Sequence, residues 1–290
     1  MRGRAVAERR PPHEHAPFEE FVRSTTLRIA LAQILSSSTP AENLETVAGR
    51  AREARAAGAE LVVFPEATMA AFGNDLNAVA EPLDGPWAQR VREIATEVGI
   101  AVVVGLFTPG DGGRIRNTLL ATGDGIEAAY DKIHLFDAFG FKESDAVAPG
   151  ETPATFALGG LTFGLATCYD VRFPALFAAN ARAGAQVQLV CASWGAGPDK
   201  ARQWDLLTAA RALDSTSYVL ACGQADPATR GIEAPDSTPL GIGRSAAIGP
   251  KGEVIQRLDG AEGLLLVDID PDQVDAARAA IPVLENARLR

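Results

Sequence analysis

The chain has very few cysteine and histidine residues, and this scarcity excludes several classes of protein. Its 290 residues include three cysteines, Cys168, Cys191 and Cys222, and three histidines. An odd number of widely spaced cysteines argues against a disulfide framework and fits a reducing compartment. Only His134 lies outside the first 15 residues, and the close Cys/His spacings typical of zinc sites do not occur. We therefore expect neither disulfides nor a metal.

Long apolar runs and an excess of positive charge are also missing. No apolar stretch is long enough to span a bilayer, and the first residues contain no apolar signal-peptide core. The 37 acidic residues outnumber the 27 basic ones, for a net charge of -10. This balance disfavours nucleic acid and anionic membrane surfaces as partners. We expect a cytoplasmic protein that binds neither nucleic acid nor membranes.

Composition divides the chain into three parts. Residues 1–25 are rich in arginine and proline and show no periodicity, which predicts a flexible basic leader. Residues 26–272 alternate between strand-like and helix-like segments and are long enough for one large α/β domain. Residues 273–290 are expected to form a C-terminal helix and tail that packs in an oligomer.

The strand-like and helix-like segments intermix along the domain. The predicted strands cover residues 27–33, 60–64, 100–107, 115–122, 126–130, 156–158, 161–166, 187–192, 217–222, 241–248, 253–258 and 263–269. The predicted helices cover residues 41–57, 86–98, 174–183, 199–213 and 271–280. Tight links at residues 123–125 and 159–160 join only antiparallel strands, so a purely parallel sheet is excluded. Two mixed sheets packed face to face and covered by helices satisfy this α/β pattern.

The most informative segment surrounds Cys168. This cysteine follows the apolar strand at residues 161–166 and precedes a predicted turn and helix. A rigid strand end of this kind is where α/β enzymes present nucleophiles to a crevice. A thiolate is a strong nucleophile, although most free cysteines are simply small buried side chains. A Cys–His dyad with His134 is disfavoured, because no partner that would orient this histidine is evident.

Glu66 and Lys132 also follow predicted strands. The apolar run at residues 60–64 ends at Pro65, so Glu66 projects from the carboxyl end of the strand, where a partly desolvated carboxylate suits general-base catalysis. Lys132 follows the strand at residues 126–130 among apolar and aromatic neighbours, where it would stabilise an oxyanion and favour a nearby thiolate. Taken alone, Glu66 fits a helix cap or surface acid, and Lys132 fits a surface lysine with a buried stem.

Glutamate, lysine and cysteine in this order, each at a strand end, resemble the nitrilase (carbon–nitrogen hydrolase) superfamily. The matching motifs are Phe64-Pro65-Glu66, then Asp131-Lys132-Ile133-His134-Leu135, then Thr167-Cys168-Tyr169-Asp170 followed by Arg172-Phe173-Pro174. The resemblance covers roughly residues 27–270. It implies a four-layer α-β-β-α sandwich, no cofactor, and assembly into a homodimer or a larger homo-oligomer.

The resemblance also implies the roles of four residues. Cys168 is expected to be the nucleophile that forms a thioester, Glu66 the general base, and Lys132 the cation that stabilises the oxyanion. Glu143, in the segment Phe141-Lys142-Glu143-Ser144-Asp145, matches a family glutamate that lies near the lysine and helps to position the substrate. Without the resemblance, Glu143 fits a solvated loop acid.

Four further residues are candidates for substrate binding. Arg172, four residues after the cysteine, suits bidentate binding of a substrate carboxylate, or else anchors the turn through carbonyls or Asp170. Tyr169 adjoins the nucleophile, and Trp194 ends the next strand and would line the pocket. Phe72, with Asn74, follows the glutamate motif and would line the entrance. Gln203 and Trp204 fit packing better than substrate contact.

The residues around the cysteine favour the amidase branch of the family. Nitrilases proper usually carry Cys-Trp-Glu, whereas this chain has Cys168-Tyr169-Asp170, which resembles omega-amidases and deaminated-glutathione amidases. Ala175 and Arg211-Ala212-Leu213-Asp214-Ser215 depart from the usual pattern of that branch. The resulting hypothesis is hydrolysis of a small linear, carboxylate-bearing carboxamide to a carboxylic acid and ammonia. The alternatives are hydrolysis of N-carbamoyl amino acids, then of nitriles, and a catalytically silent binding protein on the same fold.

Overall fold

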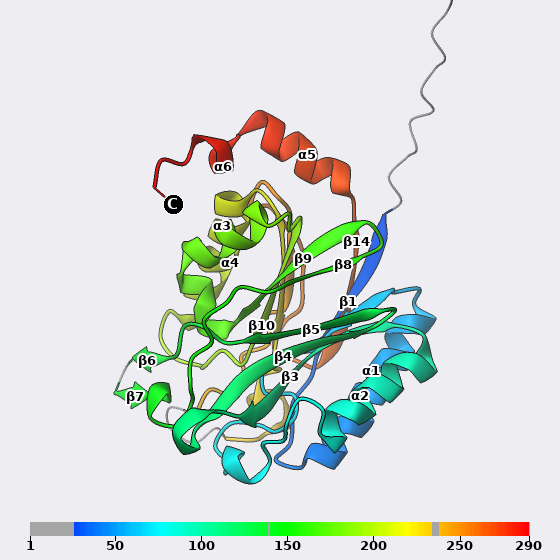
Figure 1. The fold of residues 1–290 in the computed structure, drawn as a ribbon, viewed down its shortest axis with the longest axis vertical. Helices are drawn as coiled ribbons and strands as arrows, with labels where there is room; N and C mark the ends of the chain where they lie inside the picture. The colour runs from blue at the N-terminus through cyan, green and yellow to red at the C-terminus, as the bar shows by residue number, and fades with distance from the viewer. Residues whose placement is uncertain (1–25, 139, 234–237, 290) are drawn as a thin grey trace, which may run out of the picture.

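The computed structural model describes residues 26–138, 140–233 and 238–289, so the predicted leader at residues 1–25 lies outside the described residues. Two six-stranded mixed sheets form its centre (Figure 1). The first sheet has the strand order β14 (Gly263–Ile269), β1 (Leu27–Gln33), β2 (Leu61–Val63), β3 (Ala101–Pro109), β4 (Ile115–Gly123) and β5 (Ile126–Asp131). Strands β1, β2 and β3 are mutually parallel, and the outer strands pair antiparallel.

The second sheet repeats this plan. Its strand order is β13 (Val254–Arg257), β12 (Ala246–Ile248), β11 (Tyr218–Gly223), β10 (Val187–Ala192), β9 (Leu161–Thr167) and β8 (Thr155–Leu158). Again three central strands, β9, β10 and β11, are parallel and their neighbours antiparallel. The parallel strands bring the carboxyl ends of β9 and β10 side by side, and those of β2 and β3 likewise.

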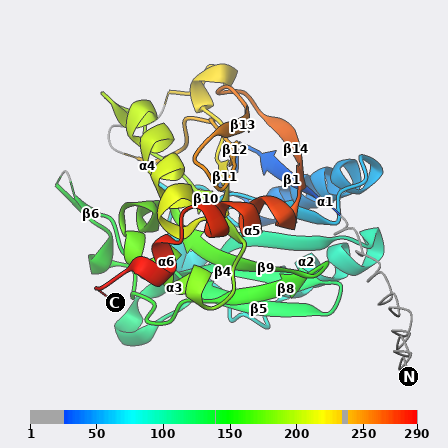
Figure 2. The same cartoon turned by 90° about the horizontal axis from the view of Figure 1, so that it is seen from above.

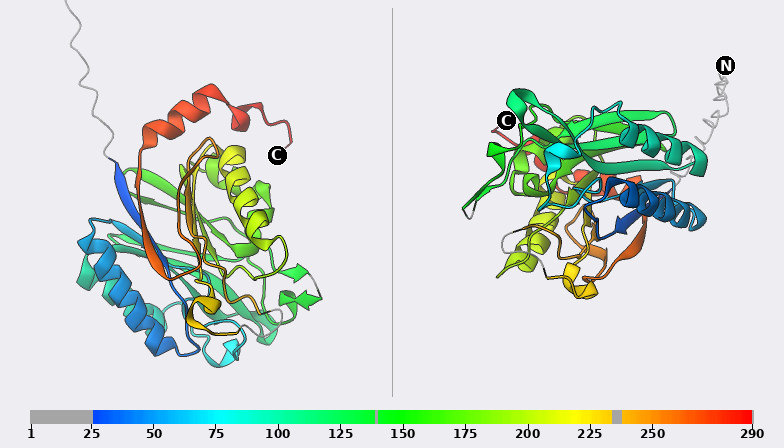
Figure 3. Two further views of the ribbon diagram at one scale, coloured as in Figure 1. Left: turned by 180° about the vertical axis from the view of Figure 1, so that it is seen from behind. Right: turned by 90° about the horizontal axis from the view of Figure 1, so that it is seen from below.

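Helices cover the outer face of each sheet. On the first sheet lie α1 (Pro40–Ala56) and α2 (Pro86–Val98), and on the second lie α3 (Pro174–Arg182) and α4 (Lys200–Ser215), as Figures 1 and 3 show. Strand β1 shows how side chains that alternate between the two faces of a strand build these layers. Ile29 and Leu31 join the core between the two sheets, whereas Ala30 and Ala32 face the core beneath α1 and α2. The predicted four-layer α-β-β-α sandwich is therefore confirmed.

The C-terminal segment packs on the same body. Helix α5 (Pro271–Ala280) crosses one end of the sheets and leads to the short α6 (Val283–Asn286), as seen from above in Figure 2. Val274 of α5 belongs to the main hydrophobic core, and Ala277 is also buried. Asp270 caps α5 by accepting from the backbone N–H of Asp272 at 3.0 Å. A role for this segment in an oligomer stays a prediction.

One predicted strand is wrong over most of its length. Residues 241–245 are irregular, and only Ala246–Ile248 pairs as β12. Gly241 and Gly243 have φ angles of 120° and 67°, which extended strands do not adopt. A side chain at Gly241 would meet the carbonyl oxygen of Gln224 at 2.4 Å, so this segment is shaped by close backbone approach rather than by the pleat of a strand.

None of the helices in the described part of the chain combines the length and the apolar character that a membrane span requires.

Candidate active site

Three side chains from three strand ends converge at one edge of the two sheets. Glu66 follows β2, Lys132 directly follows β5, and Cys168 directly follows β9. Glu66 and Lys132 are 1% and 2% exposed, so both charges lie in the interior. Lys132 Nζ donates to Glu66 Oε1 at 3.0 Å, and Cys168 interacts electrostatically with both residues. The structure thus brings together the three residues that the motifs single out.

Both carboxylate oxygens of Glu66 are held in place. Besides Lys132, Oε1 accepts from Asn117 Nδ2 at 2.7 Å, and Oε2 accepts from the backbone N–H of Ser193 at 2.8 Å. The backbone carbonyl of Glu66 accepts from Gln224 Nε2 at 3.0 Å. Such a complete set of donors stabilises a buried carboxylate and fixes its direction.

The loop that carries Glu66 depends on a glycine in the neighbouring strand. A Cβ atom at Gly105 would lie 2.8 Å from the carbonyl oxygen of Pro65 and 3.0 Å from Glu66 Cα. Real Cβ atoms do not approach backbone this closely, so only glycine fits at this point in β3.

We expect Gly105→Ala to lower the free energy of unfolding by about 1–3 kcal/mol and to reduce activity, because the backbone of Glu66 must move. Thermal unfolding and a steady-state assay would measure both effects. Gly49→Ala is the matched control, since a Cβ at Gly49 in α1 meets nothing within 4 Å. That helical substitution should stabilise the chain slightly. Equal behaviour of the two variants would contradict this role for Gly105.

Glu143 is the second buried carboxylate on Lys132. It lies in a short 3-10 helix (Glu143–Asp145), is 6% exposed, and accepts from Lys132 Nζ at 3.0 and 2.9 Å. Its Oε2 also accepts from the backbone N–H of Phe136 at 2.6 Å. Burial alone would lower the pKa of Lys132, but the carboxylates of Glu143 and Glu66 outweigh burial and raise it well above its usual value. Lys132 is therefore a permanent cation between two anions.

Cys168 has an unusual backbone conformation. Its φ angle is 46°, in the left-handed region that residues with side chains rarely adopt. The residue opens a 3-10 helix (Cys168–Arg172) immediately after β9, so its side chain is presented at a sharp strand-to-helix turn. The sulfur lies 3.8 Å from the carbonyl oxygen of Ser193. Backbone outliers of this kind cluster at functional sites.

The surroundings of Cys168 favour the neutral thiol. Burial raises the pKa of the thiol well above its usual value, and the carboxylate of Glu66 adds to this increase, whereas Lys132 lowers it. The sequence led us to expect that Lys132 would favour a thiolate. The lysine does act in that direction, but burial and Glu66 outweigh it. The thiol form of Cys168 is therefore favoured, and the Glu66 carboxylate is adjacent to it.

This raised pKa predicts the pH dependence of thiol alkylation. Only the thiolate reacts, so the rate of Cys168 alkylation by iodoacetamide should still be rising from about pH 7 to about pH 9, where a free cysteine of pKa about 8.5 begins to level off. Mass spectrometry of the cysteine peptide measures this rate. Cys191 and Cys222 are fully buried, so their peptides should stay unmodified as long as the protein is folded. A plateau below about pH 8 would show instead that Lys132 dominates.

Asp170 organises the turn that follows Cys168. This fully buried carboxylate accepts from the hydroxyl of Tyr130 at 2.6 Å, and from the backbone N–H groups of Thr167 at 2.8 Å and His134 at 3.0 Å. The ring Nδ1 of His134 lies 2.7 Å from Asp170, and the ring stacks on Phe173 with centroids 3.7 Å apart. No orienting partner for His134 is evident from the sequence, and the structure shows that Asp170 is that partner. The pair links the lysine and cysteine motifs.

Aromatic and cationic side chains gather around the short 3-10 helix that Cys168 opens. Tyr169 packs edge-on against Phe136, and the guanidinium of Arg172 lies 5.7 Å from the Tyr169 ring centroid and 5.1 Å from that of Trp194. Arg172 Nη2 donates to Gln203 Oε1 at 2.7 Å, so its partner is a neutral amide rather than Asp170. Three of the four predicted substrate contacts therefore lie together.

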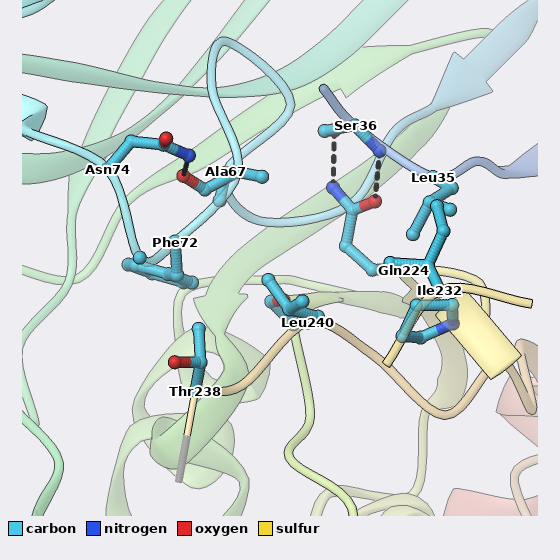
Figure 4. A pocket seen from close by; sticks show the side chains of 13 residues that line it. Leu35, Ser36, Ala67, Phe72, Asn74, Gln224, Ile232, Thr238 and Leu240 are labelled. Carbon is cyan, nitrogen blue, oxygen red and sulfur yellow. Dashed lines mark hydrogen bonds between the residues drawn. The ribbon is translucent and has the colours of Figure 1, made fainter. Parts of the chain in front are cut away.

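Phe72, the fourth, lines a cavity that Ser193 also borders. It packs edge-on against Phe107 and borders a cavity of about 240 Å³ with Leu35, Ile232 and Leu240 (Figure 4). Asn74 also lines this cavity, and its side chain donates to the carbonyl of Ala71 at 2.9 Å. The lining includes Ala67 and Ser193 but not Cys168 or Lys132. Phe72 thus lies beside the loop of Glu66, and its place at the entrance to the site stays a prediction.

Comparison with known proteins shows which family this chain is similar to. A family model described as carbon-nitrogen hydrolase matches residues 28–279. A hydrolase of Mycobacterium tuberculosis is 55% identical over 266 residues, covering 90% of this chain and 95% of the relative. A deaminated glutathione amidase of Escherichia coli O157:H7 is 34% identical (90% and 97% covered), and the omega-amidase of Homo sapiens is 32% identical (91% and 96%). An amidase from Nesterenkonia sp. AN1, solved with a covalent adduct of fluoroacetamide on its active-site cysteine, aligns with a TM-score of 0.75 at 26% identity (92% and 95%).

Proposed function

The chain belongs to the carbon-nitrogen hydrolase family of the nitrilase superfamily, and from this premise we propose that it is a thiol-dependent amidase. It hydrolyses a small linear carboxamide that carries a carboxylate, releasing a carboxylic acid and ammonia. The observation that carries the proposal is the buried contact of Glu66 and Glu143 with Lys132, at 3.0 and 2.9 Å, next to Cys168. The similarity to deaminated glutathione amidase and omega-amidase supports an amide as the substrate.

The reaction begins with acylation of Cys168. Its sulfur attacks the amide carbon while Glu66 accepts the thiol proton, which agrees with the raised pKa of the thiol. Lys132 Nζ and the backbone N–H of Tyr169 stabilise the negative charge that develops on the carbonyl oxygen. Glu66 then delivers its proton to the departing ammonia, and the acyl group remains on sulfur as a thioester.

Deacylation uses the same groups in reverse. Glu66 accepts a proton from a water molecule, which attacks the thioester carbon, and Cys168 leaves as the thiol when the proton returns. One carboxyl group thus serves as base and acid in turn, and the atoms balance without an external oxidant or reductant. Glu143 is a positioning residue in this scheme, because both of its carboxylate oxygens accept from Lys132 Nζ.

Ammonia release from a panel of small amides, N-carbamoyl amino acids and nitriles tests the proposal. Carboxylate-bearing amides should be the best substrates. Carbon dioxide formed together with ammonia from the carbamoyl acids would favour the alternative of an N-carbamoyl amino acid amidohydrolase, and hydrolysis of nitriles alone would favour a nitrilase. A folded protein with no turnover of any compound would contradict the amidase proposal.

A further inference from the structure

Asn117 contacts both charged residues of the proposed reaction. It lies near the start of β4, on the same face of the strand as Leu119 and Ala121, which belong to the core between the two sheets. Its side-chain amide donates to Glu66 Oε1 at 2.7 Å, and its backbone carbonyl accepts from the backbone N–H of Lys132 at 2.8 Å. One residue of β4 therefore fixes the general base and the cation relative to each other.

The donors around Glu66 are divided unequally between its two carboxylate oxygens. Oε1 accepts from the ammonium group of Lys132 at 3.0 Å and from the Asn117 amide at 2.7 Å. Oε2 accepts from the neutral backbone N–H of Ser193 at 2.8 Å. The cation and the amide together neutralise most of the negative charge on Oε1, so Oε2 is the oxygen better able to accept a proton.

Oε2 is also the oxygen on the side of the nucleophile. The backbone N–H of Ser193 donates to Oε2, and the carbonyl oxygen of the same residue lies 3.8 Å from the sulfur of Cys168. The thiol and the Glu66 carboxylate are close enough to interact through a hydrogen bond as well as through charge. A proton that moves between the sulfur and Glu66 is therefore expected at Oε2.

The other end of the Asn117 side chain, Oδ1, has no hydrogen-bond partner among the described residues. The residue is 1% exposed. Its amide cannot turn over, because Oδ1 would then face the carboxylate oxygen of Glu66 at the same short distance. A buried acceptor without a partner lowers stability, so an apolar side chain of similar size would suit this place in the core equally well. What asparagine adds is its donor on Glu66.

We propose that Asn117 is a positioning residue that fixes Oε2 as the oxygen of Glu66 that takes and returns the proton in each half of the reaction. The inference rests on the proposed amidase function and deepens it by adding a residue to the site. In acylation, the thiol proton passes to Oε2 and leaves with the ammonia. In deacylation, a proton of water arrives at Oε2 and returns to the sulfur. The amide and the ammonium group stay on Oε1 throughout, so the carboxyl group does not rotate.

Replacing the Asn117 amide with an acid of the same shape tests this role. In Asn117→Asp the added carboxyl group lies against Glu66 Oε1, and the other titratable groups of the site are Lys132, Glu143 and Cys168. While the added group is protonated it still donates to Oε1, and once it ionises two carboxylates face each other. Relative to the wild type, kcat should be within about tenfold at about pH 5 and reduced about 100-fold at about pH 8, with KM changed by less than about threefold.

Asn180→Asp is the matched control. Asn180 is a fully buried asparagine of α3 that donates to the carbonyl of Leu165 at 3.3 Å and to Gln188 at 3.1 Å. Its Oδ1 likewise finds no partner in the described part of the chain. The substitution should lower thermal stability, but the ratio of its kcat to that of the wild type should not change with pH while the protein is folded. A ratio for Asn117→Asp that is equally independent of pH would overturn the positioning role.

Asn117→Leu separates positioning from packing. It removes the donor on Glu66 together with the buried acceptor that has no partner, so the melting temperature should change little while kcat falls about 100-fold. A large loss of stability with an unchanged kcat of the folded protein would show that Asn117 only supports the core, and the proposal would be overturned.

An activated ester separates this role from the amidase proposal. The ester p-nitrophenyl acetate acylates Cys168 with a good leaving group, and turnover of the acetyl thioester then needs Glu66 as the base. If the wild type hydrolyses this ester but no amide, the amidase proposal fails, and a pH-dependent loss of ester turnover in Asn117→Asp still supports the positioning role. Equal pH profiles of the two proteins on the ester would overturn that role even if amides are hydrolysed.

Discussion

Replacing Cys168 with alanine should reduce amide hydrolysis by at least about 10⁴-fold, because the sulfur forms the bond that replaces the C–N bond. Removing the nucleophile leaves only binding and oxyanion stabilisation, which do not substitute for covalent catalysis. The protein should still fold. The residue is half-buried, and alanine removes a single sulfur atom, so the free energy of unfolding should change by about 1 kcal/mol or less.

Cys191→Ala is the matched control for this experiment. Cys191 is fully buried in β10, paired in register with Thr167 of β9, just before the nucleophile. Its truncation leaves a small core cavity and should lower stability more than Cys168→Ala does, while ammonia release below the unfolding temperature persists. Denaturant titration and the ammonia assay on both variants measure these effects. Wild-type activity in Cys168→Ala would remove the mechanism.

Replacing Lys132 with methionine should have the second largest effect, on stability as well as on activity. The lysine is 2% exposed and contacts Glu66 at 3.0 Å and Glu143 at 2.9 Å. Without it, two buried carboxylates face each other without a cation. Breaking a buried ion pair by removing one partner typically costs about 3–5 kcal/mol. Activity should be lost as well, because the oxyanion loses its charged donor.

Two further variants test that explanation. Lys142→Met removes an exposed lysine that pairs with Asp145 at 3.1 Å, and such surface pairs contribute about 1 kcal/mol at most. Adding Glu143→Gln to Lys132→Met should recover part of the lost stability, because one of the two uncompensated charges is removed. Urea unfolding of the wild type, Lys132→Met, Lys142→Met, the double variant and, as a reference, Glu143→Gln alone gives the comparison. If Glu143→Gln lowers stability by the same amount in Lys132→Met as in the wild type, the two carboxylates do not repel each other. That result would contradict the explanation.

The sequence predicts the fold and the reacting residues because both leave local patterns. Alternating apolar residues and tight glycine turns mark strands such as β4 and β5 nearly to the residue. Glu66, Lys132 and Cys168 each follow an apolar strand, and parallel strands end at a common edge. The family resemblance then implies the role of each of the three residues, and the structure brings them together.

Other parts of the site leave no local pattern. Asn117 is near the start of β4 and binds Glu66 only because β4 pairs with β3, which in turn pairs with the strand β2 that precedes Glu66. Ser193 acts through its backbone, which no side-chain pattern records. In the sequence, Lys200 does not differ from any lysine at the start of a helix. Only the fold brings it beside Trp194 and Arg172. These contacts depend on tertiary structure alone.

Two expectations from the sequence needed correction for similar reasons. Residues 241–245 are apolar enough to predict a strand, but positive φ angles at two glycines break the extended geometry. Asp170 was noted as part of the cysteine motif and as a possible partner of Arg172, yet it binds Tyr130 of β5 and His134 of the loop that follows β5. In both cases a neighbour far away in sequence decides the local structure.

The central claim is that amide hydrolysis passes through an acyl thioester on Cys168, and partitioning with hydroxylamine tests it most directly. Substrates with the same acyl group but different leaving groups, a primary amide, an N-methyl amide and a methyl ester, would be hydrolysed in the presence of hydroxylamine. If all three form the same thioester, the ratio of hydroxamate to acid should be identical for the three substrates, since water and hydroxylamine compete for one intermediate. A ratio that changes with the leaving group would mean that water attacks the amide directly, and the thioester mechanism would be contradicted.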